Sequence, residues 1–397
     1  MTEVATVPLG EIADIVRGVT FSKAEVTSNP TSGFLPVVRA GNIQDSLLLE
    51  KDLVYVPHEK VNVEQILRSG DIIICTSSGS SEVVGKTAIA ERDWEGTFGA
   101  FCAGIRANPE ICDPNYLFYY LRSPAFRSWT SRSSGISIKN IRKSELDLFK
   151  VPLPSLPEQR RIASILTKAD VIRRKRKQII KLTDNLLKSI FIKMFGDPGQ
   201  NPHRWPVMTI GDLTKSTQYG TSSKAGPDGE YPILRMNNLT YDGQINCRDM
   251  KYIDLSHDEI DKYTVVKGDI LFNRTNSAEL VGKTAVYQGE DRLAFAGYLI
   301  RLRTNKQALP DYVSGFLNSA YGKAKLRGMC RSIIGMANIN AKELCSISIP
   351  VPSIDIQRLY QQRLEAIINL ATLIRKKINT DNELLLSISR QAFGGEL

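Results

Sequence analysis

The chain has 397 residues, 42% hydrophobic and 24% charged, which is long enough for two or more soluble domains. No apolar run reaches the ~18 residues of a membrane span, and the start, Met1-Thr2-Glu3-Val4, lacks the basic and apolar regions of a signal peptide. The net charge of +10 favours a polyanionic partner such as nucleic acid. Six scattered cysteines without a C-x-x-C pair disfavour a metal cluster or a disulfide framework, so we expect a cytoplasmic protein.

The first elements along the chain form a mixed segment in residues 1–155. The apolar run at residues 71–75 predicts a buried strand, and residues 114–126 predict a helix that begins with proline. Prolines punctuate residues 151–157 and block the continuation of a helix or a central strand. The following residues, 156–197, predict one long helix, because 158–195 contain neither proline nor glycine and would extend roughly 55–60 Å.

The second half of the chain repeats the first at a nearly constant offset. The recurring segments are Leu35-Pro-Val-Val-Arg-Ala-Gly-Asn-Ile43 with Tyr231-Pro-Ile-Leu-Arg-Met-Asn-Asn-Leu239, Gly70-Asp-Ile72 with Gly268-Asp-Ile270, and Val84-Gly-Lys-Thr-Ala88 with Val281-Gly-Lys-Thr-Ala285. Residues 198–353 therefore predict a second mixed segment with a helix at 310–325, and residues 354–397 predict a second long helix.

Both long helices carry apolar residues at alternating spacings of four and three, which is typical of a coiled-coil seam. Asp381 interrupts the second seam, and Arg176 and Thr183 interrupt the first. A seam must be covered, so we expect the two helices to pack antiparallel on each other. The predicted fold is α+β, with two similar mixed α/β domains joined by two long antiparallel coiled-coil helices and an internal pseudo-two-fold repeat. The alternative is that each helix packs on its own domain alone.

Motifs for catalysis are weak. Gly85-Lys86-Thr87 resembles the end of a phosphate-binding P-loop, but the required first glycine is replaced by Ser80, and by Ser277 in the second copy. We therefore interpret this segment as a strand–turn–strand element with a lysine near a binding face. The three histidines form no metal-binding pair, and no nucleophile elbow occurs. These absences favour a binding protein.

Basic and amide residues in matched turns are better candidates, because Arg can pair with guanine, Asn with adenine, and Ser or Lys with phosphate. For any one of them the alternative is a solvated or turn-forming loop residue. The candidate DNA-binding residues are Arg39, Asn42, Ser77, Ser78, Lys86, Arg132, Ser133, Lys139, Asn140, Arg235, Asn237, Asn238, Arg274, Asn276, Lys283, Arg331, Asn338 and Asn340. The basic run at residues 173–177 has two open interpretations, namely DNA or an acidic partner.

The ordered duplicate resembles the specificity (S) subunits of type I restriction–modification systems over the whole chain. The boundary Leu156-Pro157-Glu158-Gln159-Arg160-Arg161-Ile162-Ala163 is similar to this family's L-P-x-x-E-Q-x-x-I signature. The second boundary departs from it, because Ile356-Gln357 keeps the glutamine and lacks the glutamate.

The resemblance implies a division into target-recognition domain 1 (residues 1–155), a central long helix or conserved spacer region (156–197), target-recognition domain 2 (198–353) and a C-terminal long helix (354–397). It implies a non-catalytic subunit of a DNA adenine methyltransferase and type I restriction endonuclease complex. Such a subunit binds a bipartite asymmetric target in double-stranded DNA, one half per domain, and its helices act as a ruler. Its partners are two modification (methyltransferase) subunits and restriction/translocase subunits.

The resemblance also implies that this chain holds no cofactor or metal of its own. S-adenosylmethionine, ATP and Mg²⁺ would bind to the partner subunits. No membrane partner is expected. The alternative function is a stand-alone architectural DNA-binding protein that ignores sequence.

Overall fold

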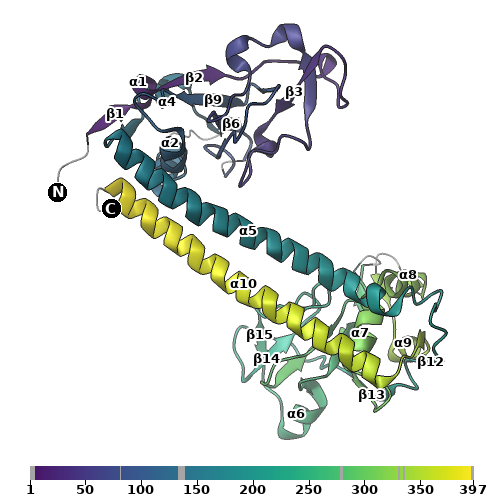
Figure 1. The fold of residues 1–397 in the computed structure, drawn as a ribbon. Helices are drawn as coiled ribbons and strands as arrows, with labels where there is room; N and C mark the ends of the chain where they lie inside the picture. Colours follow the sequence, from purple (N-terminus) through teal and green to yellow (C-terminus); the bar gives the residue numbers. More distant parts are fainter. Residues whose placement is uncertain are drawn as a thin grey trace. The chain divides into compact units, whose positions relative to one another are not determined.

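The computed structural model describes residues 5–80, 82–132, 139–277, 280–329, 331–333 and 336–394 (Figure 1). Internal contacts divide the chain into two compact units, which we describe separately. Unit 1 comprises residues 1–178 and 374–397, and unit 2 comprises residues 179–373. Each of the two long helices contributes one part to each unit. Among the described residues, no helix is both long and apolar enough to cross a bilayer.

The main sheet of unit 1 has four antiparallel strands in the order β2 (Ala13–Arg17), β9 (Cys102–Ala107), β5 (Ile72–Cys75) and β7 (Thr87–Ile89). Side chains alternate between the two faces of a strand. In β5, Ile72 and Ile74 belong to one hydrophobic cluster, and Ile73 and Cys75 to another. The predicted buried strand is confirmed, and its unbroken apolar run follows from having both faces covered.

Shorter elements surround this sheet. The smaller sheets of unit 1 are β4 (Val54–Pro57) with β3 (Phe34–Val38) and β8 (Thr97–Phe98), β1 (Thr6–Pro8) with β11 (Lys150–Pro152), and β6 (Ser77–Ser78) with β10 (Lys139–Asn140). The short helices are α1 (Leu9–Ile12), α2 (Pro114–Tyr120), α3 (Pro124–Arg132) and α4 (Lys143–Asp147), with 3-10 turns at Lys23–Glu25, Ala40–Asn42, His58–Lys60 and Val63–Gln65.

Unit 2 repeats this strand order in its main sheet. The strands are β13 (Thr214–Tyr219), β21 (Leu299–Thr304), β17 (Ile270–Asn273) and β19 (Thr284–Val286). The smaller sheets are β15 (Lys251–Ile253) with β14 (Tyr231–Leu234), β20 (Leu293–Phe295) and β16 (Thr264–Val265), then β12 (Val207–Thr209) with β24 (Ser348–Pro350), and β18 (Thr275–Asn276) with β23 (Met336–Asn338) and β22 (Arg331–Ile333). The short helices are α6 (His257–Tyr263), α7 (Pro310–Asn318), α8 (Ala320–Met329) and α9 (Ala341–Cys345).

The short helix predicted in each copy is in fact two helices. In unit 1 the break between α2 and α3 precedes Pro124, which has no amide hydrogen to continue α2 and fits a first turn instead. In unit 2 Ser319 separates α7 from α8 with an extended backbone, and its hydroxyl accepts a hydrogen bond from Gly322 N at 3.0 Å. The prediction of single helices at 114–126 and 310–325 was therefore wrong.

The Gly-Lys-Thr segments are turns, as predicted. Gly85 and Gly282 adopt φ angles of +78° and +77°, in the left-handed region that favours glycine. A Cβ atom at Gly85 would also lie 2.7 Å from Thr130 Cγ2, and one at Gly282 would lie 2.7 Å from Leu326 Cδ1. Each glycine therefore lets a strand connection turn closely against a helix.

A buried glutamine fixes the start of each long helix. Gln159, in α5 (Leu156–Phe195), accepts a hydrogen bond from Asp113 N at 2.8 Å and donates to Pro154 O at 2.8 Å. Gln357, in α10 (Ile354–Gly394), accepts from Leu309 N at 2.8 Å and donates to Pro352 O at 3.0 Å. Both helix starts are thus fixed by the same glutamine hydrogen bonds. The absence of the signature glutamate before Gln357 does not change them.

The charged interruptions of the two seams, Arg176 and Asp381, pair with each other, while the Thr183 hydroxyl donates to Ile180 O within α5 at 2.8 Å. In unit 1 Arg176 of α5 forms an ion pair with Asp381 of α10, and their side chains are 27% and 16% exposed. Ile162, near the start of α5, belongs to the same hydrophobic cluster as Ala392, near the end of α10. The helices therefore run antiparallel in unit 1.

Unit 2 shows the same direction. The ring of Phe195, the last residue of α5, lies 5.2 Å from the ring of Tyr360, near the start of α10. Phe191 contacts Tyr360 edge-on at 5.8 Å. The prediction of an antiparallel pair is confirmed, and the alternative in which each helix packs on its own domain alone is excluded.

We expect that replacing Asp381 by Leu lowers the free energy of unfolding by about 1–3 kcal/mol, because Arg176 would stay in the partly buried seam without its partner. Replacing both residues by Leu should recover that loss. Chemical denaturation measures both effects. The exposed pair Arg358–Asp355 is the control, and Asp355→Leu should cost under about 1 kcal/mol. A double variant as unstable as the single one would contradict this account of the seam.

Candidate nucleic-acid interface

Two matched loops carry the first candidates, and their asparagines are buried. Asn42 is 2% exposed, accepts a hydrogen bond from Arg39 N at 2.8 Å and donates to Lys51 O at 2.7 Å. Asn238 is also 2% exposed, accepts from Arg235 N at 2.9 Å and donates to Asn246 O at 2.9 Å. These side chains hold the loops together and are not presented to a ligand.

The arginines of these loops are partly engaged as well. The Arg39 guanidinium donates to Asp52 O at 3.0 Å, and that of Arg235 donates to Asp249 O at 3.1 Å. Asn237, between Arg235 and Asn238, is exposed. The loops at 39–52 and 235–249 are therefore built alike and differ in the side chains on their surface.

The small sheets β6–β10 and β18–β23–β22, which we call the tips, bring together candidates that are distant in sequence. In unit 1 β6 pairs with β10, so that Ser78 faces Lys139 and Ser77 faces Asn140. In unit 2 β18 pairs with β23, which places Asn276 opposite Ala337 and Thr275 opposite Asn338. The Thr275 hydroxyl lies 3.4 Å from the Asn338 side-chain oxygen. Each unit thus presents a polar tip, and the residues of the two tips differ.

Arg274 is held in place by an aromatic ring that the sequence analysis missed. Its guanidinium lies over the Tyr219 ring, 4.8 Å from the centroid. The Tyr219 hydroxyl accepts a hydrogen bond from Ala341 N at 2.9 Å, which fixes the ring. The buried Arg274 Nε has no hydrogen-bond partner among the described residues. Arg274 is therefore oriented by stacking on Tyr219.

The repeated lysines have different surroundings. Lys86 is exposed, whereas Lys283 is half-buried and donates to Leu239 O at 3.0 Å. Burial lowers the pKa of Lys283. Close by, Lys323 is 5% exposed, donates to Gly282 O at 2.9 Å and lies over the Tyr241 ring. Burial, with Lys283 adding to it, lowers the pKa of Lys323 to about 8. In unit 2 Lys323 thus connects the Gly282 turn to α8.

The remaining candidates divide into three kinds. Asn340 caps α9, since its side chain accepts a hydrogen bond from Glu343 N at 2.9 Å. Arg132, Lys139 and Arg331 lie in α3, β10 and β22, where the structure describes their backbone only. Ser133 lies outside the described residues.

Four cations of the basic run at residues 173–177, namely Arg173, Arg174, Arg176 and Lys177, pair with acids of unit 1. Arg173 Nη2 lies 2.7 Å from the carboxylate of Asp170, which is 3% exposed, and 2.9 Å from Asp45. Lys177 also contacts Asp45, at 2.7 Å. Hydrogen bonds and charge attraction from Arg173 and Lys177 outweigh burial and lower the pKa of Asp45. These four cations therefore have acidic partners within the chain itself.

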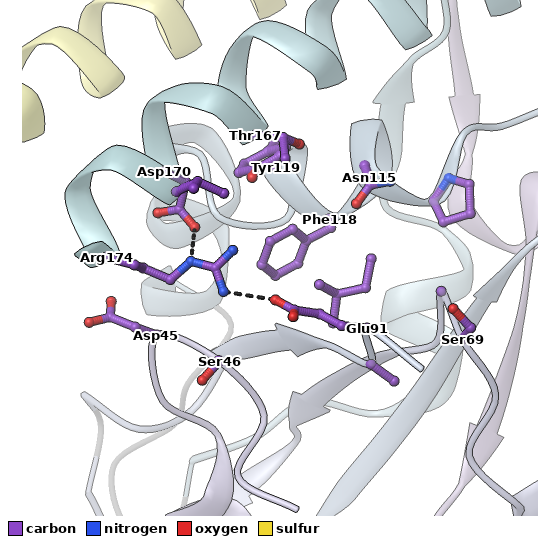
Figure 2. A pocket seen from close by; sticks show the side chains of 15 residues that line it. Asp45, Ser46, Ser69, Glu91, Asn115, Phe118, Tyr119, Thr167, Asp170 and Arg174 are labelled. Carbon is purple, nitrogen blue, oxygen red and sulfur yellow. Dashed lines mark hydrogen bonds and ion pairs between the residues drawn. The ribbon is translucent and has the colours of Figure 1, made fainter. Parts of the chain in front are cut away.

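A cavity of about 500 Å³ adjoins this network, between α5, α2 and the loops of unit 1 (Figure 2). Arg174 spans it, with Nε 3.2 Å from Asp170 and Nη1 2.8 Å from Glu91 (Figure 2). Phe118 and Tyr119 supply apolar surface. These ion pairs attach the sheet loops of unit 1 to the first half of α5. Among the described residues, no cluster of His, Cys, Asp and Glu suits a metal ion.

Comparisons with known proteins agree with the resemblance. The family described as "Type I restriction modification DNA specificity domain" matches residues 1–183 and 202–381. The chain is 31% identical to the StySPI specificity subunit of Salmonella potsdam, over 99% of this chain and 89% of that protein. It is 29% identical to the EcoKI specificity subunit of Escherichia coli K12, over 98% and 88%.

A solved structure shares the fold. The type I restriction–modification S subunit from M. genitalium superposes with a TM-score of 0.62 at 15% identity, over 98% of this chain and 96% of that one. With the family match across both copies, the chain therefore belongs to the specificity (S) subunits of type I restriction–modification systems.

Proposed function

We propose that this chain reads a bipartite, asymmetric target in double-stranded DNA, one half with each unit. The observation that carries the proposal is a shared frame with unlike tips. Unit 1 presents Ser77, Ser78 and Asn140, whereas unit 2 presents Asn276 and Asn338 beside Arg274. Two readers of different half-sites need such a combination, because base edges are read by the identity of the side chains.

Arg274 is the strongest base-reading candidate. A guanidinium can donate two parallel hydrogen bonds to O6 and N7 of guanine. Stacking on Tyr219 restricts its orientation, so less conformational entropy is lost on binding. Asn42 and Asn238 act indirectly in this proposal, by holding the loops that carry Arg39 and Asn237.

The long helices are proposed to recruit the partners, two methyltransferase subunits and the restriction/translocase subunits. Large apolar side chains are exposed along both helices. They are Ile172 (48%), Ile179 (39%), Leu182 (58%), Leu186 (38%) and Ile192 (41%) in α5, and Leu359 (43%), Leu370 (46%), Leu373 (52%), Leu384 (51%) and Leu386 (47%) in α10. Exposed apolar surface of this extent favours protein association. The chain itself would carry no catalytic step, and S-adenosylmethionine, ATP and Mg²⁺ would be held by the partners.

Replacing Arg274 by Ala should relax base preference in one half of the target only. The expected loss on the cognate duplex is about 1–3 kcal/mol, the worth of one bidentate base contact. The measurement is selection from a randomised duplex library by the complex with its methyltransferase, followed by binding titrations. Ser78→Ala should act on the other half.

Arg292→Ala is the matched control for Arg274→Ala. Arg292 also lies in unit 2, but it is paired with Asp261 at 2.6 Å, away from the tip strands. Its replacement should leave both half-sites unchanged. Equal weakening on all duplexes by Arg274→Ala would instead favour the architectural, sequence-independent function.

Inserting four residues after Lys181 should shift the preferred spacer between the half-sites by one or two base pairs. The insertion adds ~6 Å and ~40° of helix, while one base pair adds ~3.4 Å and ~34°. Methylome sequencing of cells that express the variant with its methyltransferase measures the spacer. The same insertion after Asn29, on an exposed loop of unit 1, is the control. An unchanged spacer with retained activity would exclude a ruler role for α5.

A further inference from the structure

Each unit exposes an aromatic ring at the same place, and no motif marked either ring in the sequence. In unit 1 Phe101 lies in the turn between β8 and β9 and is 70% exposed. In unit 2 Tyr298 lies between β20 and β21 and is 52% exposed. The positions correspond, because Val19 bridges Gly99 in unit 1 as Thr221 bridges Ala296 in unit 2.

Both turns are held closely by the backbone. Cys102 N donates to Gly99 O at 2.8 Å, and Leu299 N donates to Ala296 O at 2.8 Å. Such a four-residue turn fixes the backbone of its third residue, which is Phe101 in unit 1 and Tyr298 in unit 2. The exposed rings are therefore carried on rigid supports and not on long loops.

The turns are also attached to the polar tips. Phe101 O accepts hydrogen bonds from Thr76 N at 2.9 Å and Ser77 N at 3.2 Å. Tyr298 O accepts from Arg274 N at 3.0 Å. In each unit, then, the aromatic residue is bonded to the backbone of the residues that we propose to face DNA.

Exposure of a single apolar residue is ordinary on a protein surface. Two features distinguish this pair. The exposure recurs at one structural position in both units, and the ring differs between the units in its hydroxyl. Burial of apolar surface is favourable, so an exposed ring beside a polar tip has apolar surface available for a ligand.

We propose that Phe101 and Tyr298 are specificity-determining residues that pack against the C5-methyl group of a thymine, one in each half-site. This inference rests on the proposed function. The thymine methyl is the apolar feature of the major groove, which admits a two-stranded β ribbon, and Phe is among the side chains that contact it. In unit 1 β6–β10 is such a ribbon, and in unit 2 the β18–β23 pair carries β22 as a third strand.

The test uses the complex of the full chain with its methyltransferase and duplexes that carry the selected target. Each thymine of a half-site is replaced in turn by uracil, which removes only the methyl group. One uracil in the half-site read by unit 1 should weaken wild-type binding roughly four- to tenfold, the effect expected for a buried methyl. Phe101→Ala should bind the thymine duplex with a similar loss and should not discriminate thymine from uracil at that position.

Tyr298→Ala should behave in the same way in the other half-site, while Tyr298→Phe should keep the discrimination. Leu148→Ala and Val207→Ala are the controls, because these residues are 72% and 60% exposed but lie outside the tips. They should leave uracil discrimination intact. Thermal unfolding of all variants should match the wild type, since the altered side chains are exposed.

Three outcomes would overturn this inference. The first is a selected target with a half-site that contains no thymine. The second is uracil discrimination that stays unchanged in Phe101→Ala and Tyr298→Ala. The third is a loss of affinity in these variants that is equal on all duplexes, which would indicate that the ring inserts between bases. Failure of the proposed function is distinguishable, because the wild-type complex would then bind all duplexes alike.

Discussion

The apolar seam of the long helices is the constraint on which the rest of the structure depends. A helix of about 40 residues cannot be stable in water unless its apolar face is covered. The chain covers α5 with α10, and it places the two charged interruptions, Arg176 and Asp381, opposite each other. Gln159 and Gln357 then fix each helix start to the mixed domain that precedes it. Surface residues of the mixed domains can therefore change without disturbing the helix pair to which the domains are attached.

In both units, the residues that hold the fold together are different from the residues that form the proposed DNA-facing surface. Gly85 and Gly282 make the same turn, and Asn42 and Asn238 brace the same loop. Changes at these buried or strained positions would disturb the fold. The tips and the aromatic turns lie on the surface and differ between the copies, so their substitution changes chemistry with little cost in stability. Lys86 and Lys283 show how one repeated residue serves two environments, exposed in one unit and tied to Leu239 O in the other.

Much of this organisation could be predicted from the sequence, because it depends on patterns with strong physical causes. Proline stops, apolar spacing and the repeat predicted the long helices and their antiparallel packing. The break before Pro124 was missed, although proline at a first turn signals it. The bracing role of Asn42 could not be predicted, since an asparagine in a turn pattern does not reveal which way its side chain points. Tyr219 lies far from Arg274 in the sequence, and only the strand pairing brings them together.

The internally paired basic run has a consequence for how affinity responds to salt. A cation that neutralises a DNA phosphate releases a condensed counterion, and each such contact makes the logarithm of affinity fall by about 0.9 per decade of salt. Arg173, Arg174 and Lys177 already contact Asp45, Glu91 and Asp170, so they have little charge left to release ions from DNA. The salt dependence of DNA binding would then depend on the other Lys and Arg residues of the surface. The densest basic segment would contribute to the rigidity of unit 1 and not to its attraction for a polyanion.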